Sequence, residues 1–273
     1  AFATQLPGFA TQLNNHVPAT GMAVVALYFA LGLSTGKLAP KPWRFAVFGL
    51  CAAFVFTLDM PMTIFPAIAG VILLTRFPLP AFLWGGLGAL LPLAVHFGIM
   101  ITVTGSPLPV QMNHDLYLYE GSYWRNPGGI DALNEPAALY LFHMTFGRHG
   151  SFLLFPVLLL SVAGAVAALV RRGLPHRGYI LAGAIGFAIL TAYYVIGTNN
   201  YGGVAFGFRW HIGAMPVLLL MGLPFLKTPR PYWKWVFFAL LLAVSMYSAW
   251  QCYQGPWNTG HEWPTRLLFG PRC

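Results

Sequence analysis

Long uninterrupted apolar blocks, separated by short polar segments, constrain this chain more than any other feature of its sequence. A helix needs roughly 20 apolar residues to cross about 30 Å of hydrocarbon, and such blocks recur about eight times. Only 8% of the residues are charged, against roughly 25% in a soluble domain. We therefore predict an all-α, polytopic integral membrane protein in which residues 1–273 form a single transmembrane domain. The predicted spans are residues 17–35, 43–58, 61–76, 80–103, 151–170, 178–197, 210–226 and 232–251.

The charged residues divide between the two ends of these spans. Alternate threading puts ten of the 15 lysines and arginines at one end, which the positive-inside rule makes cytoplasmic. All six acids fall at the opposite end, and both termini are predicted to lie outside. This division of the net charge of +9 indicates membrane lipid as a partner and no nucleic acid. The ten cations are Lys37, Lys41, Arg44, Arg76, Arg171, Arg172, Arg177, Lys227, Arg230 and Lys234.

The outer side carries the longer connections. A loop covers residues 104–150 and a tail covers residues 252–273, whereas every cytoplasmic connection is short. Long loops in compact proteins are usually functional, so we expect any chemistry on the outer side. The tail contains Cys252 and Cys273. Oxidation is permitted on the outer side, so the sequence leaves open whether these two cysteines form a disulfide.

One segment of the outer loop has the pattern of a helix. The sequence Asn134-Glu135-Pro136 predicts a cap followed by proline in the first turn. The apolar residues that follow at helical spacing are Leu139, Phe142 and Phe146. We expect this amphipathic helix to lie along the membrane surface, with its aromatic residues at headgroup depth.

Asp59 lies between the second and third predicted spans, at the outer boundary of the membrane. Acids at that depth are costly and are usually functional, which makes Asp59 a candidate catalytic residue. The alternative is a helix cap, because Pro61 follows in what would be the first turn of the next span. The sequence leaves both interpretations open.

Three consecutive polar side chains precede the first span. Asn14, Asn15 and His16 offer several hydrogen-bond donors and acceptors in a row, so they are candidates to bind a polar headgroup or a sugar. Capping of the span is the alternative, and it explains one asparagine better than the whole triplet.

A glycine-rich segment at residues 199–208 leads to Arg209. Glycine allows backbone to approach a ligand closely, and arginine presents a fixed fork of donors suited to phosphate. Arg209, with Tyr201 in the same segment, is therefore a candidate to bind a phosphate. The alternative is a cationic anchor at the membrane surface beside Trp210.

The outer loop supplies the remaining candidates. Its aromatic rings offer flat faces to sugars or lipid headgroups, and its acids are candidate general bases or metal ligands. Trp124, Arg125 and Glu135 are the candidate substrate-binding residues. The histidines of the loop lack the spacing of a metal site, so we predict none, although a divalent cation stays an open alternative.

Five runs of sequence carry a resemblance to a known family. On these runs the chain resembles bacterial membrane proteins of the GT-C glycosyltransferase superfamily, which resemble the dolichyl-phosphate-mannose protein mannosyltransferases and the lipid A sugar transferases. The similarity covers the whole chain and is to the later part of such a protein. The repeated pentapeptide FATQL near the start is accordingly expected to be the end of an earlier helix. The runs are TQLNNHVPA (11–19), FTLDMP (56–61), GSYWRNPGGIDALNEP (121–136), LFHMTFGRHG (141–150) and NNYGGVAFGFRW (199–210).

The resemblance implies an envelope enzyme of the bacterial cytoplasmic membrane. Such an enzyme moves a sugar from a polyprenyl-phosphate donor to an acceptor on the extracytoplasmic face. It implies that Arg209 contacts the donor phosphate, and it matches Asp59 loosely to an acidic position. The catalytic acid of such enzymes usually lies in a first external loop, which we expect this chain to lack, so we do not expect the chain to be active alone. No cofactor is implied.

Two other classes of protein compete with the transferase. A transporter or flippase would place ionisable groups near the middle of the membrane, but the predicted spans hold few, His96 being the main exception. A non-catalytic subunit of a membrane complex would not need so polar an outer loop. Most soluble enzyme classes are excluded, because the sequence has no Walker A motif, dinucleotide fingerprint, serine-hydrolase elbow or paired-cysteine metal motif.

Overall fold

The computed structural model describes residues 2–227, 231–257 and 262–269. Over these residues every regular element is a helix, which confirms the all-α class. The long helices are α2 (His16–Ser34), α3 (Pro42–Leu58), α4 (Ile64–Arg76), α5 (Pro78–Thr104), α9 (Leu159–Val170), α10 (Arg177–Gly197), α11 (Met215–Lys227) and α12 (Tyr232–Gln254). The short α-helices are α1 (Leu6–Ala10), α6 (His114–Tyr117), α7 (Ala137–Thr145), α8 (Ser151–Leu154) and α13 (Trp263–Phe269). The 3-10 helices are η1 (Met60–Thr63), η2 (Val110–Met112), η3 (Tyr123–Arg125), η4 (Gly129–Ala132), η5 (Pro156–Leu158) and η6 (Arg209–Ala214).

Five helical segments of the described chain are long and apolar enough to cross a membrane. Three further apolar helices, Pro42–Leu58, Met60–Arg76 and Pro156–Val170, are shorter. All eight predicted blocks are thus helical, while eight complete crossings stay a prediction. The five long segments are His16–Ser34, Pro78–Thr104, Arg177–Gly197, Arg209–Leu226 and Tyr232–Gln254.

The block predicted as one span over residues 151–170 is broken near its start. Helix α8 ends before Phe155, and η5 begins at Pro156. Proline disfavours a helical conformation in the residue before it and cannot donate a backbone hydrogen bond. The next amide, Val157 N–H, is satisfied by the Ser245 hydroxyl of α12 at 2.9 Å, so the break is joined to a neighbouring helix.

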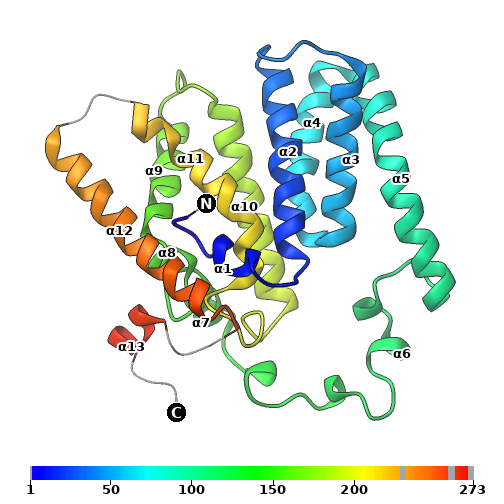
Figure 1. Cartoon of the computed structure of the whole chain (residues 1–273), viewed down its shortest axis with the longest axis vertical. Coiled ribbons are helices and arrows are strands. Elements are labelled where there is room, and N and C mark those ends of the chain that lie inside the picture. The colour runs from blue at the N-terminus through cyan, green and yellow to red at the C-terminus, as the bar shows by residue number, and fades with distance from the viewer. Residues whose placement is uncertain (1, 228–230, 258–261, 270–273) are drawn as a thin grey trace.

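The long helices form two groups that lie side by side (Figure 1). Helices α2 to α5 make one group and α9 to α12 the other, and consecutive helices run in opposite directions within each group. One hydrophobic core lies between α2, α3 and α4. A second, larger core contains side chains of α2, η1 and α4 on one side and side chains of the elements from α7 to α12 on the other. Helix α5 packs on α3 and leaves most of its surface exposed.

Glycines set the closest helix crossings. A Cβ atom on Gly49 of α3 would lie 1.8 Å from the Gly85 carbonyl oxygen of α5, and one on Gly164 of α9 would lie 2.0 Å from the Met221 carbonyl oxygen of α11. In each case backbone meets backbone, which only glycine permits. Small residues of this kind allow close packing between helices inside a membrane.

Replacing Gly49 with alanine is expected to lower the thermal stability of the protein in detergent. The added methyl group would overlap the Gly85 carbonyl, and overpacking of this kind typically costs about 1–3 kcal/mol. Gly86→Ala on the partner helix α5, next to Gly85, is the matched control, because a Cβ there meets nothing within 4 Å. Equal melting temperatures for the two variants would contradict the crossing.

The two ends of the bundle differ in charge, as the threading predicted. All six acids lie at the end that contains the 105–150 loop, which we call the acidic end (Figure 1); they are Asp59, Asp115, Glu120, Asp131, Glu135 and Glu262. The opposite, basic end carries Lys37, Lys41, Arg44, Arg76, Arg171, Arg172, Arg177 and Lys234. Helix α11 also ends there at Lys227, whereas Arg230 lies outside the described residues. Which end faces the cytoplasm stays a prediction.

Candidate functional site

His16 and Asp59 form a buried pair at the acidic end. His16 opens α2 and Asp59 follows α3, so the two antiparallel helices bring the side chains together. The Nδ1 atom of His16 lies 2.8 Å from Oδ2 of Asp59, and the side chains are 9% and 4% exposed. Asp59 does occupy the cap position of η1, but its carboxylate makes no capping hydrogen bond there. Its carboxylate therefore contacts His16 and does not cap η1.

The two asparagines before His16 bond to protein groups. Asn14 Oδ1 accepts from the Val17 amide at 3.0 Å and so caps α2. Asn15 Nδ2 donates to the Leu58 carbonyl at 2.7 Å, one residue before Asp59. Of the predicted triplet, Asn14 and Asn15 thus position the start of α2 against the end of α3, and His16 completes the joint.

Tyr194 of α10 connects this pair to Arg209. Its side chain is buried, and its hydroxyl lies within electrostatic range of both Asp59 and Arg209. Its ring stacks on Trp210 with the ring centroids 4.8 Å apart. Helix α2, which His16 opens, also contacts η6, which Arg209 opens, so the acid and the cation that the sequence predicted separately lie beside elements in contact.

The Arg209 guanidinium is held without a carboxylate partner among the described residues. It lies over the Trp257 ring at 5.3 Å from the ring centroid, and its Nε atom is buried with no hydrogen-bond partner. Gly202 has a φ of +85°, and a Cβ there would lie 2.9 Å from Arg209 Cγ. Glycine backbone thus lies against the arginine stem, while its predicted close approach to a ligand stays a prediction. A half-buried cation with an unpaired Nε atom is suited to an anionic ligand.

Asp131 ties the outer loop to the segment that precedes Arg209. Asn200 Nδ2 donates to Asp131 Oδ1 at 3.0 Å, and the Tyr123 hydroxyl donates to Oδ2 at 3.1 Å. The charge of Asp131 also acts on Arg209. The sequence did not single out Asp131, although it stands in the run GSYWRNPGGIDALNEP.

Tyr201 and Glu135, predicted to contact different parts of a substrate, contact each other. The Tyr201 hydroxyl donates to Glu135 Oε2. The Tyr201 ring stacks on His149 at 4.6 Å between centroids and lies 4.4 Å from the Tyr140 ring. Its side chain is 3% exposed. A direct contact between Tyr201 and a phosphate would therefore compete with Glu135.

Helix α7 starts after Pro136, whereas the sequence had predicted this proline in its first turn. It covers Ala137–Thr145, and Pro136 stands at its cap position with no side-chain capping bond. The predicted cap by Asn134 or Glu135 is therefore wrong, because the Glu135 carboxylate turns to Tyr201 instead. Burial raises the pKa of the Tyr140 hydroxyl on this helix. The apolar side chains left exposed are Leu139, Phe142 and Phe146.

Trp124 and Arg125 lie on the exposed part of the outer loop. Trp124 stacks on Tyr117 with centroids 5.6 Å apart and planes at 16°. Arg125 Nε donates to the Leu118 carbonyl at 2.7 Å. Both side chains thus pack against neighbouring loop residues and shape an aromatic surface at the acidic end.

Two further buried polar groups escaped the sequence analysis. His211 in η6 is fully buried, with Nδ1 2.9 Å from the Ser151 hydroxyl and Nε2 3.3 Å from the Thr191 hydroxyl. Gln5 Nε2 donates to the Phe208 carbonyl at 3.0 Å. Polar residues at the edges of apolar blocks were a signal for His211 and Ser151, but no signal pointed to Gln5.

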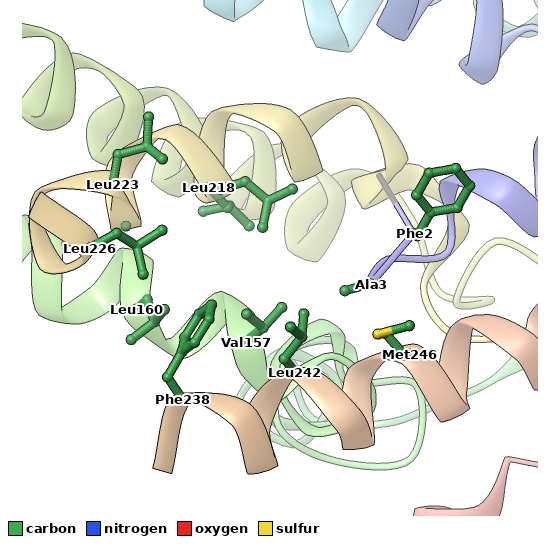
Figure 2. A pocket seen from close by; sticks show the side chains of 12 residues that line it. Phe2, Ala3, Val157, Leu160, Leu218, Leu223, Leu226, Phe238, Leu242 and Met246 are labelled. Carbon is green, nitrogen blue, oxygen red and sulfur yellow. The ribbon is translucent and has the colours of Figure 1, made fainter. Parts of the chain in front are cut away.

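An apolar cavity of about 260 Å³ lies between α11 and α12 (Figure 2). Leu218, Leu223 and Leu226 line it from α11, and Phe238 lines it from α12. Phe2, three residues before Gln5, lies at one end of the cavity. Gln5 bonds to the carbonyl of Phe208, the residue before Arg209, so the segment that carries Phe2 is tied to the segment that carries the arginine.

The remaining polar chemistry of the acidic end is limited. Within residues 2–227, 231–257 and 262–269, no group of three or more His, Cys, Asp or Glu side chains is placed to hold a metal ion. The Cys252 thiol is fully buried and faces the Gln5 carbonyl at 3.6 Å. Its predicted partner, Cys273, lies outside the described residues.

Comparisons with protein-family models, with curated proteins and with solved structures gave no match.

Proposed function

We propose that the protein is a membrane glycosyltransferase that moves a sugar from a polyprenyl-phosphate donor to an acceptor at the acidic end. The observation that carries the proposal is the Arg209 site. There a half-buried guanidinium, with no carboxylate in ion-pair contact among the described residues, opens the helical stretch that continues into an apolar cavity. A lipid-linked phosphate needs both features, a cation for its headgroup and an apolar groove for its chain.

The cavity and the arginine lie along one helical stretch. Arg209 opens η6, which continues into α11, and α11 lines the cavity from Leu218 to Leu226. At about 2 Å per residue in the 3-10 helix η6 and about 1.5 Å per residue in α11, Leu218 is roughly 16 Å from Arg209 along this axis. A phosphate at Arg209 would therefore leave its isoprenoid chain free to run beside α11 and α12 (Figure 2).

The His16–Asp59 pair supplies the base in this proposal. The acceptor oxygen attacks the anomeric carbon, the bond from that carbon to the donor phosphate breaks, and the acceptor proton passes to the Asp59 carboxylate. His16 orients the carboxylate from its other side. Arg209 stabilises the charge that the departing lipid phosphate gains.

The proposal includes a location. The basic end faces the cytoplasm of a bacterial cell, by the positive-inside rule, and the acidic end faces outward. The eight apolar helices are then transmembrane, with the three shorter ones tilted or in a locally thinned bilayer. A donor carried on the outer leaflet reaches the acidic end directly.

The experiment is sugar transfer in proteoliposomes from radiolabelled polyprenyl-phosphate sugars, with the protein in its natural length. Leu223→Trp should fill the cavity and raise the KM for the donor about tenfold or more, because the isoprenoid chain loses its groove. Leu220→Trp is the matched control: Leu220 is similarly exposed on α11 and does not line the cavity.

Three outcomes distinguish the classes of protein. Transfer by the wild type, impaired in Leu223→Trp alone, supports the transferase. Equal transfer by the wild type and both variants would show that the cavity does not bind the isoprenoid chain of the donor. No transfer with any donor would remove the transferase, and lipid or solute movement across the same vesicles would then favour a transporter or flippase over a non-catalytic subunit.

A further inference from the structure

A second, small cavity opens at the acidic end between α7 and the end of α10. Its volume is about 80 Å³, which is room for a few water molecules. The polar side chains on its wall are Glu135, Tyr140, Thr198 and Asn199. The apolar ones are Leu133, Ala137 and Val195.

Most hydroxyl groups around this cavity are already committed. Thr198 donates its proton to the Tyr194 carbonyl at 2.7 Å, so in its 2.9 Å contact with Tyr140 the tyrosine must be the donor. The Tyr140 oxygen accepts from the Tyr201 amide at 3.2 Å. These hydrogen bonds use the hydroxyl protons of both Tyr140 and Thr198, so neither residue has a donor left for a ligand in the cavity.

Two polar groups remain for a ligand. Glu135 receives the Tyr201 hydroxyl on Oε2, and its Oε1 atom has no partner among the described residues. The Asn199 amide likewise has no hydrogen-bond partner in the part of the chain that the structure describes, and it can both donate and accept. The cavity therefore offers one strong acceptor and one adaptable amide beside an apolar floor.

The backbone at Tyr201 points to a functional role for this wall. Tyr201 has a φ of +51°, in the left-handed region that a residue with a bulky side chain rarely adopts. The hydrogen bond from its backbone N–H to the Tyr140 hydroxyl, and the contacts of its ring with His149 and Tyr140, hold it there. Conformations of this kind cluster at functional sites, where the surrounding structure maintains them. Here the result is that the hydroxyl fixes the Glu135 carboxylate at the cavity.

We propose that this cavity binds adjacent hydroxyl groups on one edge of a sugar or polyol, and that it is the acceptor site of the transferase; the second part rests on the proposed function. A carboxylate oxygen accepts from one hydroxyl, the Asn199 amide bonds to its neighbour, and the C–H face of the ring packs on Ala137 and Val195. The three N–H donors of an ammonium group would meet only two free side-chain oxygens among the described wall residues, Glu135 Oε1 and Asn199 Oδ1.

The test is saturation-transfer NMR on the protein in lipid nanodiscs, with methyl α-D-glucopyranoside, myo-inositol and ethanolamine as probes. Ala137→Phe fills the cavity and should reduce the polyol signals at least fivefold. Ala138→Phe, at the adjacent exposed residue that does not line the cavity, should retain them. Glu135→Gln, which keeps the shape of the side chain, should weaken them and carries the test if Ala137→Phe does not fold.

Several results would overturn the proposal. They are equal polyol signals in Ala137→Phe and Ala138→Phe, unchanged signals in Glu135→Gln, stronger binding of ethanolamine than of the polyols, or no binding by the wild type. These measurements need no donor. Polyol binding without sugar transfer would therefore preserve the site while removing the transferase, and transfer without polyol binding would do the reverse.

Discussion

Replacing Asp59 with asparagine is expected to lower the rate of sugar transfer by about 10²–10⁴-fold, the usual contribution of a positioned general base. Asparagine keeps the size of the side chain and an oxygen for His16, but it cannot take up the acceptor proton. The measurement is kcat with a radiolabelled lipid-linked donor, alongside the melting temperature. Asp115→Asn is the control, because the Asp115 side chain is 99% exposed on the outer loop.

The alternative to this prediction is a purely structural pair. Asp59→Ala leaves a buried His16 without its partner, which typically costs about 1–3 kcal/mol of stability. If the pair acts as one unit, Asp59→Asn and the double variant with His16→Gln should transfer at similar rates, since such effects are not additive. A folded Asp59→Asn variant with the wild-type rate would show that the pair only joins α2 to α3.

Replacing Arg209 with alanine is expected to lower kcat by about 10²–10³-fold, as when a preorganised donor to a developing charge is removed. Lysine at this position should restore the activity in part, because it keeps the charge but not the fork of donors. Arg172→Ala is the control, since Arg172 is exposed at the basic end. If a folded Arg209→Ala variant transfers sugar at the wild-type rate, the role of Arg209 is only that of an anchor packed on Trp257.

The helices were predictable from the sequence because each apolar block is long and bounded by polar residues or proline. The predicted block 17–35 became His16–Ser34, and 80–103 became Pro78–Thr104. The break before Pro156 was missed, because the apolar residues on both sides of it hide the change in backbone. Local hydrophobicity predicts where a helix lies but not where proline interrupts it.

The sequence predicted which residues belong to the candidate site, but it did not predict most of the contacts between them. His16 and Asp59 were each selected, and their pairing follows from two antiparallel neighbours whose polar ends must meet. The contact between Tyr201 and Glu135 joins residues 66 positions apart, one in the outer loop and one in a glycine-rich segment. No periodicity connects two such irregular segments, so only the folded chain reveals the bond.

The bond from Gln5 to Phe208 spans 203 residues of sequence. Gly8 of α1 packs against Cys252, and the Phe9 ring meets the edge of Trp257 at 5.3 Å between centroids. The surroundings of Arg209 thus combine segments that lie more than 200 residues apart in the sequence. These surroundings are complete only once α1 has docked on α12 and Trp257 lies against the Arg209 guanidinium, so helices α2 to α11 packed without them would leave the Arg209 site unfinished.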